Sequence, residues 1–311
     1  MAIAPPALRA RDSIGIVAPA GPTDLARLTR GLEMVPRDIE VVLSPSLRAG
    51  YERSAAPRYL ADSDARRIEE FNAMLRNPDI RAIVIARGGY GLMRILPQLD
   101  SAALRADPKP IVGFSDGTAL LSWAWHNGVR GIHGPIAQQF ADIRAQDVVN
   151  LFELLRNREP CGALPWQLRT SHANAVEGRM VGGNANLISH LLATPWPVPN
   201  EAALLCLEDV GEKPYSIDRY LTHLGLAGAL QHTHAIVAGT FTRCMDPLPA
   251  LGAVDDPSEA LAVIAERAHA HSVPLWQGAE FGHGNENAPW SFGARARLEG
   301  SQLVILDAAV A

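Results

Sequence analysis

Short apolar runs alternate with helix-like segments through the first half of the chain. The apolar runs predict strands at residues 14–18, 40–43, 80–86 and 111–114, and the segments between them predict helices at residues 24–35, 63–76 and 117–127. Strands that are apolar on both faces and alternate with helices are typical of a parallel sheet covered on both sides. The pattern therefore predicts an α/β fold whose N-terminal domain, residues 1–140, holds an open parallel sheet.

The second half of the chain follows a different pattern. Residues 141–175 are polar and poorly periodic and contain Pro160 and Pro165, so we interpret them as a connecting segment. Beyond them we expect strands at residues 204–207, 235–238, 294–298 and 302–306, and helices at residues 216–225 and 257–270. The last two strands would form a hairpin across Gly300. These elements predict a smaller, mixed β/α C-terminal domain over residues 176–311.

Composition and charge narrow the class of protein. The chain has 311 residues, 48% of them apolar and 20% charged, which is ordinary for a soluble globular protein of two domains. The net charge is −5 and the basic residues are dispersed, so no nucleic-acid partner is expected. No apolar stretch approaches the roughly 20 residues of a membrane-spanning helix, and the N-terminus lacks an export signal. We expect no contact with a membrane.

Cysteine and ligand patterns point to a cytoplasmic protein without a metal. The three cysteines (Cys161, Cys206 and Cys244) are odd in number and lack metal-ligand spacing, which favours a reducing compartment. No zinc-protease motif, paired-cysteine motif or calcium-loop spacing occurs in the sequence.

Ser115 stands in the segment with the strongest chemical signal. The segment Pro110-Ile111-Val112-Gly113-Phe114-Ser115-Asp116-Gly117 predicts a strand that turns sharply into a helix. A serine between two glycines at such a turn is typical of a nucleophile elbow. The start of the following helix would favour a developing oxyanion. The alternative is that Ser115 simply caps the helix.

A serine nucleophile needs a base, and the base in turn needs an acid that orients it. Among the ten histidines, His283 differs because it lies in a glycine-bracketed loop after a predicted strand, where functional residues are frequent. Glu208 ends a strongly apolar strand and could hold the imidazole tautomer. The alternatives are a loop histidine satisfied by its neighbours, and a Glu208 paired with Arg219 or Lys213.

The segment Arg87-Gly88-Gly89-Tyr90-Gly91 follows the third predicted strand. It lacks dinucleotide-binding spacing because Arg94 stands where the last glycine would be, so a nucleotide-dependent oxidoreductase is disfavoured. Its glycines would allow backbone N–H groups to approach a substrate oxygen, as an oxyanion hole needs. The alternative is a tight turn between strand and helix.

Taken in order, these motifs resemble those of the LD-carboxypeptidases, or muramoyltetrapeptide carboxypeptidases. The resemblance runs nearly end to end and is carried by Ile16-Val17-Ala18-Pro19, Arg87-Gly88-Gly89-Tyr90-Gly91, Gly113-Phe114-Ser115-Asp116, His133-Gly134-Pro135, Gly182-Gly183-Asn184, Thr194-Pro195-Trp196, Leu207-Glu208-Asp209, Asp218-Arg219 and Phe281-Gly282-His283.

The resemblance implies a catalytic triad of Ser115, Glu208 and His283, with the serine on one domain and its partners on the other. Glu212 is the rival of Glu208 for the acid. The chain departs from the family pattern at Pro289-Trp290-Ser291-Phe292, a loop expected to border the site, and at Gly117, where the family often has a larger residue.

The resemblance further implies a cytoplasmic, homodimeric serine peptidase that needs no cofactor. It would release the terminal D-Ala from murein tetrapeptides during cell-wall recycling. Backbone N–H groups of Gly89 and Asp116 would stabilise the oxyanion, while Arg87 and Asn184 would bind substrate.

Two alternatives stay open on the sequence alone. One is a peptidase of the microcin self-immunity type, which cleaves a peptidyl-nucleotide amide. The other is a non-enzymatic, two-domain ligand-binding protein, in which Ser115, Glu208 and His283 would not converge.

Overall fold

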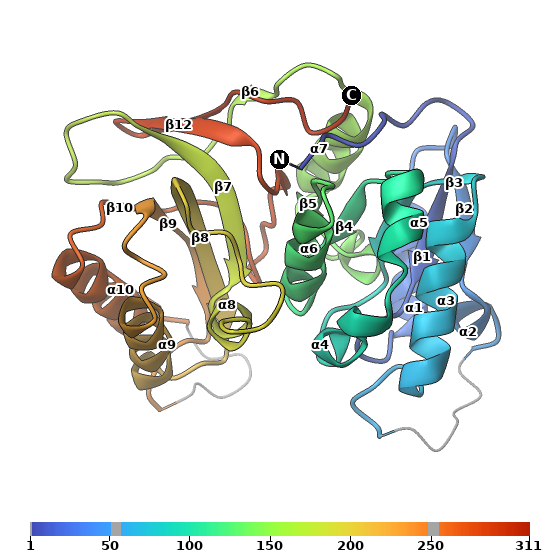
Figure 1. The fold of residues 1–311 in the computed structure, drawn as a ribbon, viewed down its shortest axis with the longest axis horizontal. Helices are drawn as coiled ribbons and strands as arrows, with labels where there is room; N and C mark the ends of the chain where they lie inside the picture. Colours follow the sequence, from blue (N-terminus) through green and yellow to red (C-terminus); the bar gives the residue numbers. More distant parts are fainter. Residues whose placement is uncertain (1, 51–56, 248–254) are drawn as a thin grey trace. The chain divides into compact units, whose positions relative to one another are not determined.

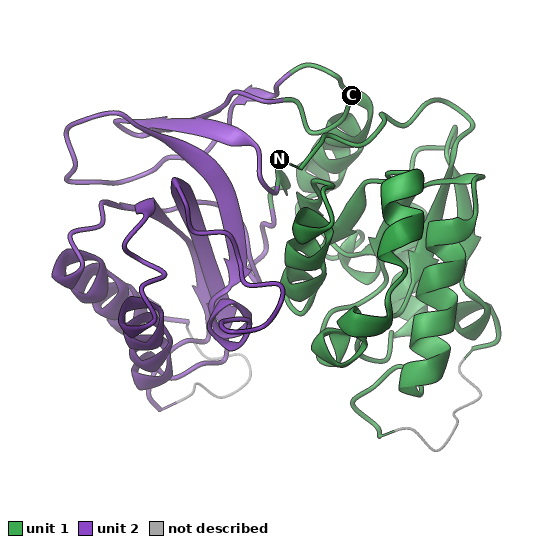
Figure 2. Cartoon of the chain, in the orientation of Figure 1, with its two compact units in different colours: residues 1–159, 288–291, 308–311 green, residues 160–287, 292–307 purple. Residues whose placement is uncertain are grey.

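The structure, a computed structural model, describes residues 2–50, 57–247 and 255–311. The chain divides into two compact units, shown in different colours in Figure 2. Unit 1 comprises residues 1–159, 288–291 and 308–311, and unit 2 comprises residues 160–287 and 292–307. Each unit is built around one sheet with helices, which confirms the predicted α/β fold class.

Unit 1 contains a six-stranded sheet in the order β11-β5-β4-β3-β1-β2. Five neighbouring strands are parallel, as predicted, and the short strand β11 pairs antiparallel with β5 at one edge. The strands are β1 (Ser13–Val17), β2 (Glu40–Leu43), β3 (Ile80–Ile85), β4 (Ile111–Gly113), β5 (Ile132–His133) and β11 (Trp290–Ser291).

Helices cover both faces of this sheet, which explains the continuous apolar runs of its strands. Ala82 and Val84 of β3 belong to a core cluster with Leu28 of α1 and Leu151 of α7. Ile85 faces the other way, against α6, and α3, α5 and α6 lie over that part of the unit in Figure 1. The helices are α1 (Leu25–Leu32), α2 (Pro45–Arg48), α3 (Asp64–Arg76), α4 (Leu92–Ile95), α5 (Ser101–Ala106), α6 (Gly117–His126) and α7 (Ala145–Arg156).

Helix α7 corrects one expectation from the sequence. It lies inside residues 141–175, for which we predicted no regular element, and it buries Val148, Leu151 and Leu155. These residues recur at helical spacing, but the polar residues around them masked the short amphipathic stripe. A second short element of the same segment, strand β6 (Gly162–Ala163), belongs to unit 2.

Unit 2 contains a seven-stranded mixed sheet in the order β10-β9-β8-β7-β12-β13-β6. Strands β7 to β10 run parallel, whereas β12, β13 and β6 pair antiparallel. The predicted hairpin is present, with Glu299 opposite Gln302 across Gly300. The strands are β7 (Val176–Asn184), β8 (Ala203–Val210), β9 (Thr233–Thr242), β10 (Leu275–Gln277), β12 (Arg295–Glu299) and β13 (Gln302–Ile305), and the helices are α8 (Ala185–His190), α9 (Pro214–Leu226) and α10 (Ser258–Ala270).

A β-bulge interrupts the pairing of β8 with β9. Leu207 is opposite Ala238 and Asp209 is opposite Phe241, so a single residue of β8, Glu208, opposes two residues of β9. Bulges bend a strand and re-aim its side chains, and they are frequent next to active sites. The two residues of β9 that oppose Glu208 are Gly239 and Thr240.

Within the described residues, no helix combines the length and the apolar character that crossing a membrane requires.

Candidate active site

Ser115 lies in the sharp turn between β4 and α6, with a backbone φ of 60°. This left-handed conformation is unfavourable for a residue with a side chain, and such strain is concentrated at functional sites. Gly113 and Gly117 leave room beside the turn for Ile85, because an added Cβ atom would lie 3.2 Å from Cδ1 of Ile85 at Gly113 and 3.0 Å from it at Gly117. The N-cap position of α6 is occupied by Asp116 and not by Ser115. Helix capping therefore does not explain the serine.

The carboxylate of Asp116 ties this turn to the loop that follows β3. Its Oδ2 atom accepts a hydrogen bond of 2.8 Å from the backbone N–H of Leu92. Burial raises the pKa of Asp116 to about 6, although the Leu92 bond and the charge of Arg67 act in the opposite direction. The side chain therefore has a structural role, and the backbone N–H of Asp116 is a separate group at the start of α6.

The glycine loop after β3 approaches the serine closely. A Cβ atom on Gly88 would lie 2.9 Å from the Cβ atom of Ser115 and 3.0 Å from its Oγ atom. Gly89 has a φ of 101°, which favours glycine. Arg87 donates a hydrogen bond to the carbonyl oxygen of Pro22, so its guanidinium is anchored to the backbone of the loop after β1.

Arg67 of α3 supports this loop cluster and was not singled out from the sequence. Its side chain is buried, and one guanidinium nitrogen, Nη1, donates to the carbonyl oxygens of Pro19 and Gly91. The other terminal nitrogen donates to Asp64 at 2.6 Å. A buried charge requires such partners, so Arg67 connects the loops after β1 and β3. Its sequence signal is weak because α3 carries several other arginines and glutamates.

In unit 2, Glu208 and His283 form a short hydrogen bond, 2.6 Å between Oε2 of the glutamate and Nδ1 of the histidine. Glu208 is buried at the bulge of β8, whereas the His283 side chain is 17% exposed. Glu212, the rival of Glu208 for the acid, instead accepts a hydrogen bond from Asn186. Glu208, and not Glu212, therefore orients the imidazole. This bond fixes the orientation of the imidazole ring through Nδ1.

Electrostatics of the pair favour a charged imidazolium. Burial of the His283 ring opposes the charged form, but Glu208 and, at longer range, Asp209 outweigh it and raise the pKa of His283. The Oε1 atom of Glu208 is buried and has no hydrogen-bond partner among the described residues. The Glu208 carboxylate therefore makes its hydrogen bond to His283 through Oε2. A carboxylate in this position stabilises an imidazolium that forms during catalysis.

Asp209 and Asn184 form a second polar pair beside Glu208. Asn184 lies opposite Glu208 in the pairing of β7 with β8, and its amide donates to Asp209 at 2.8 Å. Asp209 also accepts from the backbone N–H of Asn186. Burial, and then the charge of Glu208, raise the pKa of Asp209 to about 7. Asn184 also caps α8 by accepting from the backbone N–H of Leu187, so its amide has local partners at both ends.

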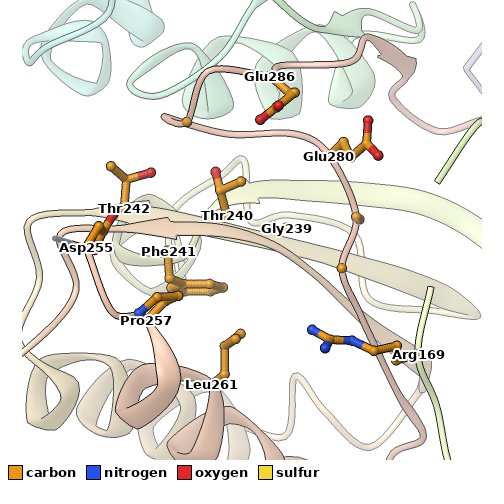
Figure 3. Close-up of a pocket in the computed structure, with 13 residues that line it drawn as sticks. Arg169, Gly239, Thr240, Phe241, Thr242, Asp255, Pro257, Leu261, Glu280 and Glu286 are labelled. Atoms are coloured by element: carbon orange, nitrogen blue, oxygen red, sulfur yellow. The ribbon is translucent and has the colours of Figure 1, made fainter. Parts of the chain in front are cut away.

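A pocket of about 360 Å³ lies beside the loop that carries His283, entirely within unit 2. Figure 3 shows Thr240 and Thr242 projecting from one side of β9 and Phe241 from the other. Glu280 and Glu286 stand on the segment that passes over the two threonines in this view. The pocket borders the His283 loop through Gly284 and Glu286.

Trp290 departs from the expectation for the segment 289–292. We predicted a loop there, but Trp290 and Ser291 form strand β11 against β5. The Trp290 ring is buried and stacks on the ring of His133, with centroids 4.7 Å apart. Trp290 therefore contributes to the core of unit 1.

Each unit thus assembles part of the predicted site. Unit 1 gathers Ser115, Asp116 and the glycine loop, whereas unit 2 joins Glu208 to His283 and places Asn184 on the adjacent strand. Three features of the two units were not predicted from the sequence: the buried Arg67, the hydrogen bonds of Asp209 and the bulge in β9.

Comparison with known proteins finds two domains of one family in this chain. The model of the LD-carboxypeptidase N-terminal domain matches residues 14–134, and that of the LD-carboxypeptidase C-terminal domain matches residues 177–298. The chain is 32% identical over 307 residues to the murein tetrapeptide carboxypeptidase of Pseudomonas aeruginosa, covering 93% of this chain and 94% of that protein.

Solved structures extend the likeness. The muramoyltetrapeptide carboxypeptidase from Oxalobacter formigenes matches with a TM-score of 0.80 and 28% identity, over 95% of this chain and 99% of that one. The microcin C7 self-immunity protein shares the fold, with a TM-score of 0.84 at 22% identity and 99% coverage of both chains.

These matches define a hydrolase, a serine-type LD-carboxypeptidase. The chain belongs to the LD-carboxypeptidase family, with both of its domains present. Family membership sets aside the alternative of a non-enzymatic binding protein.

Proposed function

We propose that Ser115, Glu208 and His283 form the catalytic triad and that the enzyme releases the terminal D-amino acid from a murein tetrapeptide. The observation that carries the proposal is the 2.6 Å bond between Oε2 of Glu208 and Nδ1 of His283, which is the contact expected between the acid and the base of a triad. The strained backbone of Ser115 supports its role as nucleophile. The name of the Pseudomonas relative supports the substrate.

In this mechanism Ser115 attacks the carbonyl carbon between an L-configured residue and the terminal D-residue. His283 takes the hydroxyl proton at Nε2 and later transfers it to the leaving amine. Glu208 holds the imidazole through Nδ1 and stabilises the positive charge that it acquires. A water molecule then hydrolyses the acyl-enzyme by the same proton path, which restores the serine.

The oxyanion of the tetrahedral intermediate needs backbone donors. We propose the N–H groups of Gly89 and Asp116, because one lies in the glycine loop next to Ser115 and the other at the start of α6. Removal of one such donor typically costs about 10²–10³ in rate. Arg87 and Asn184 remain proposed substrate contacts, although both have local partners in the structure.

A second candidate substrate is a peptidyl-nucleotide amide. It is favoured by a 25% identity over 307 residues with the microcin C7 self-immunity protein of Escherichia coli. The chemistry at the serine would be unchanged. The higher identity to the murein enzyme makes the tetrapeptide our first choice.

The test is release of D-Ala from purified murein tetrapeptide by the wild type, Ser115→Ala and Ser101→Ala. Ser101 lies in the same unit on α5 and serves as the matched control. We expect release by the wild type and by the control, and none above background by Ser115→Ala. Persistent release by Ser115→Ala would overturn the nucleophile, and cleavage of a peptidyl-nucleotide in preference to the tetrapeptide would establish the second substrate. A cytoplasmic location, a role in cell-wall recycling and a homodimeric state stay predictions.

A further inference from the structure

The peptide group between Phe281 and Gly282 is held at both ends, by Thr240 of β9 and by Asn287 further along the same loop. Its carbonyl oxygen accepts two hydrogen bonds from Thr240, one of 2.9 Å from the backbone N–H and one of 3.1 Å from Oγ1. Its N–H group donates to Oδ1 of Asn287 at 3.1 Å. His283 is the next residue along the chain, so the orientation of this peptide group sets the position from which the His283 side chain projects.

The bulge in β9 is what brings Thr240 to this position. Because Gly239 and Thr240 together oppose Glu208, the strand bends there. The bend needs a glycine, since a Cβ atom on Gly239 would lie 2.5 Å from the carbonyl oxygen of Phe281. Figure 3 shows Thr240 pointing from β9 toward the side on which the segment with Glu280 and Glu286 passes.

Gly282 lies in close contact with both Thr240 and the catalytic pair. A Cβ atom on Gly282 would lie 2.4 Å from Oγ1 of Thr240, 2.9 Å from the Cβ atom of Glu208 and 3.0 Å from its Oε2 atom. Its φ of 126° is a conformation that favours glycine. The Thr240 hydroxyl and the Glu208 carboxylate therefore flank the same glycine, one residue before His283.

Burial shows that these contacts are not incidental surface bonds. Asn287 is fully buried, and its Oδ1 atom accepts the bond from Gly282, without which this buried oxygen would be costly. The ring of Phe281 is also buried, with its centroid 5.6 Å from that of Trp166, which fixes the loop from the side opposite its polar contacts. The loop before His283 is thus held by both apolar and polar contacts.

We propose that Thr240 and Asn287 are positioning residues that act as a peptide clamp. The clamp fixes the Phe281–Gly282 peptide group and so keeps Nδ1 of His283 in line with Oε2 of Glu208. Both residues act through His283 and not on the substrate. The proposal rests on the proposed function, in which His283 is the general base.

The test compares Thr240→Val, which keeps the shape but removes the hydroxyl, with Thr240→Ser, which keeps the hydroxyl. Asn287→Ala removes the other end of the clamp. Thr242→Val and Asn285→Ala are matched controls, because Thr242 lies on the same strand and Asn285 is exposed on the same loop. The free energy of one typical hydrogen bond corresponds to a rate effect of about five- to tenfold. We expect this loss in kcat, with unchanged KM, for Thr240→Val and Asn287→Ala, and near wild-type values for Thr240→Ser and both controls.

Two further readouts separate positioning from simple structural support. A single peptide group held at two ends predicts non-additivity, so the double variant should be little worse than either single variant. The pKa of His283, followed by NMR of its ring protons, should fall in Thr240→Val because the Glu208 bond lengthens. If Asn287→Ala does not fold, the comparison of Thr240→Val with Thr240→Ser tests the clamp by itself.

The clamp would be overturned if Thr240→Val kept both the kcat and the His283 titration of the wild type, or if Ser impaired the enzyme as much as Val. The clamp would also be overturned if the losses in kcat of the two single variants simply multiplied in the double variant. The NMR readout does not depend on the substrate. A shifted His283 titration in an enzyme that releases no D-Ala would support the clamp and contradict the proposed function.

Discussion

Gly88 and Ser115 are in direct contact at the ends of neighbouring strands β3 and β4. A Cβ atom on Gly88 would come within 2.9 Å of the Cβ atom of Ser115 and within 3.0 Å of its Oγ atom. The hydroxyl thus has the glycine backbone on one side, where no side chain fits. This relationship leads to the first prediction.

Substitution of Gly88 by alanine should displace the Ser115 side chain while leaving the fold intact. Gly88 is not among the residues with positive φ, so alanine can adopt its backbone conformation. We expect kcat for D-Ala release to fall about 10–100-fold, because small misplacements of a reacting group cost that much. Thermal unfolding of the variant checks the fold. Full activity in a folded Gly88→Ala protein would mean that the contact with Ser115 does not constrain the nucleophile.

Substitution of Glu208 by glutamine should shift the pH dependence of the reaction. The wild-type pKa of His283 is raised, its burial being outweighed by the charge of Glu208. A base must be neutral, so the wild-type rate falls as the pH drops below this raised pKa. In Glu208→Gln the His283 pKa falls, and the acid limb of the kcat/KM profile moves to lower pH. The maximal rate should drop by roughly two to four orders of magnitude.

Glu212→Gln is the matched control for that experiment. Glu212 bonds to Asn186 and not to His283, so the histidine titration should keep its wild-type value. A shift of the acid limb in Glu212→Gln, with none in Glu208→Gln, would reverse the assignment of the acid.

Substitution of Asp116 by asparagine should stabilise the protein at neutral pH. Burial raises the pKa of Asp116 from 3.8 to about 6. The folded state therefore binds a proton more tightly than the unfolded state, and stability is lost as the pH rises from about 4 to about 6. Asparagine cannot ionise, and its amide oxygen can still accept from the N–H of Leu92.

Urea unfolding at two pH values checks this prediction. Near pH 4 the two proteins should differ little, whereas near pH 7.5 the variant should gain up to about 3 kcal/mol. Catalytic activity should be retained, because the proposed oxyanion contact is the backbone N–H of residue 116. An equal difference in unfolding free energy at both pH values would show that Asp116 does not titrate as described.

Substitution of Gly282 by alanine should be much more damaging than the same change at Gly211. Both residues have positive φ, at 126° and 69°. Gly211 has no atom within 4 Å of an added Cβ atom, whereas Gly282 is crowded by Thr240 and Glu208. Backbone strain alone costs about 1–2 kcal/mol, and overpacking adds about 1–3 kcal/mol at Gly282. Denaturant unfolding measures the difference, and equal losses at the two positions would contradict the packing described around Glu208.

The amino-acid sequence by itself determined most of the local structure. Strands such as β1 and β3 are found where apolar runs predicted them, because buried strands leave a continuous apolar signal. Helix α3 begins at Asp64 after Ser63, which accepts from the backbone N–H of Arg66 as a capping serine should. The elbow at Ser115 was also predictable, since glycines at 113 and 117 are a local requirement of a sharp turn.

Other elements lacked a local signal strong enough to predict. The apolar stripe of α7 is short and flanked by polar residues, and β11 has only two residues, Trp290 and Ser291, whose pairing with β5 joins segments about 160 residues apart in the chain. A strand of that length acquires its conformation from its partner. The same holds for the buried Arg67, whose role depends on carbonyl groups of two separate loops.

The candidate site shows where sequence information ended. Sequence patterns marked Glu208 as a strand end and His283 as a residue of a glycine loop, and favoured Glu208 over Glu212 as the acid, but spacing alone did not exclude Glu212. Only the tertiary structure decided between them, because a contact between residues 75 positions apart depends on how β8, β9 and the following loop pack together. The bulge that brings Thr240 under the His283 loop is decided at the same level, since strand register is a property of paired chains and not of any single segment.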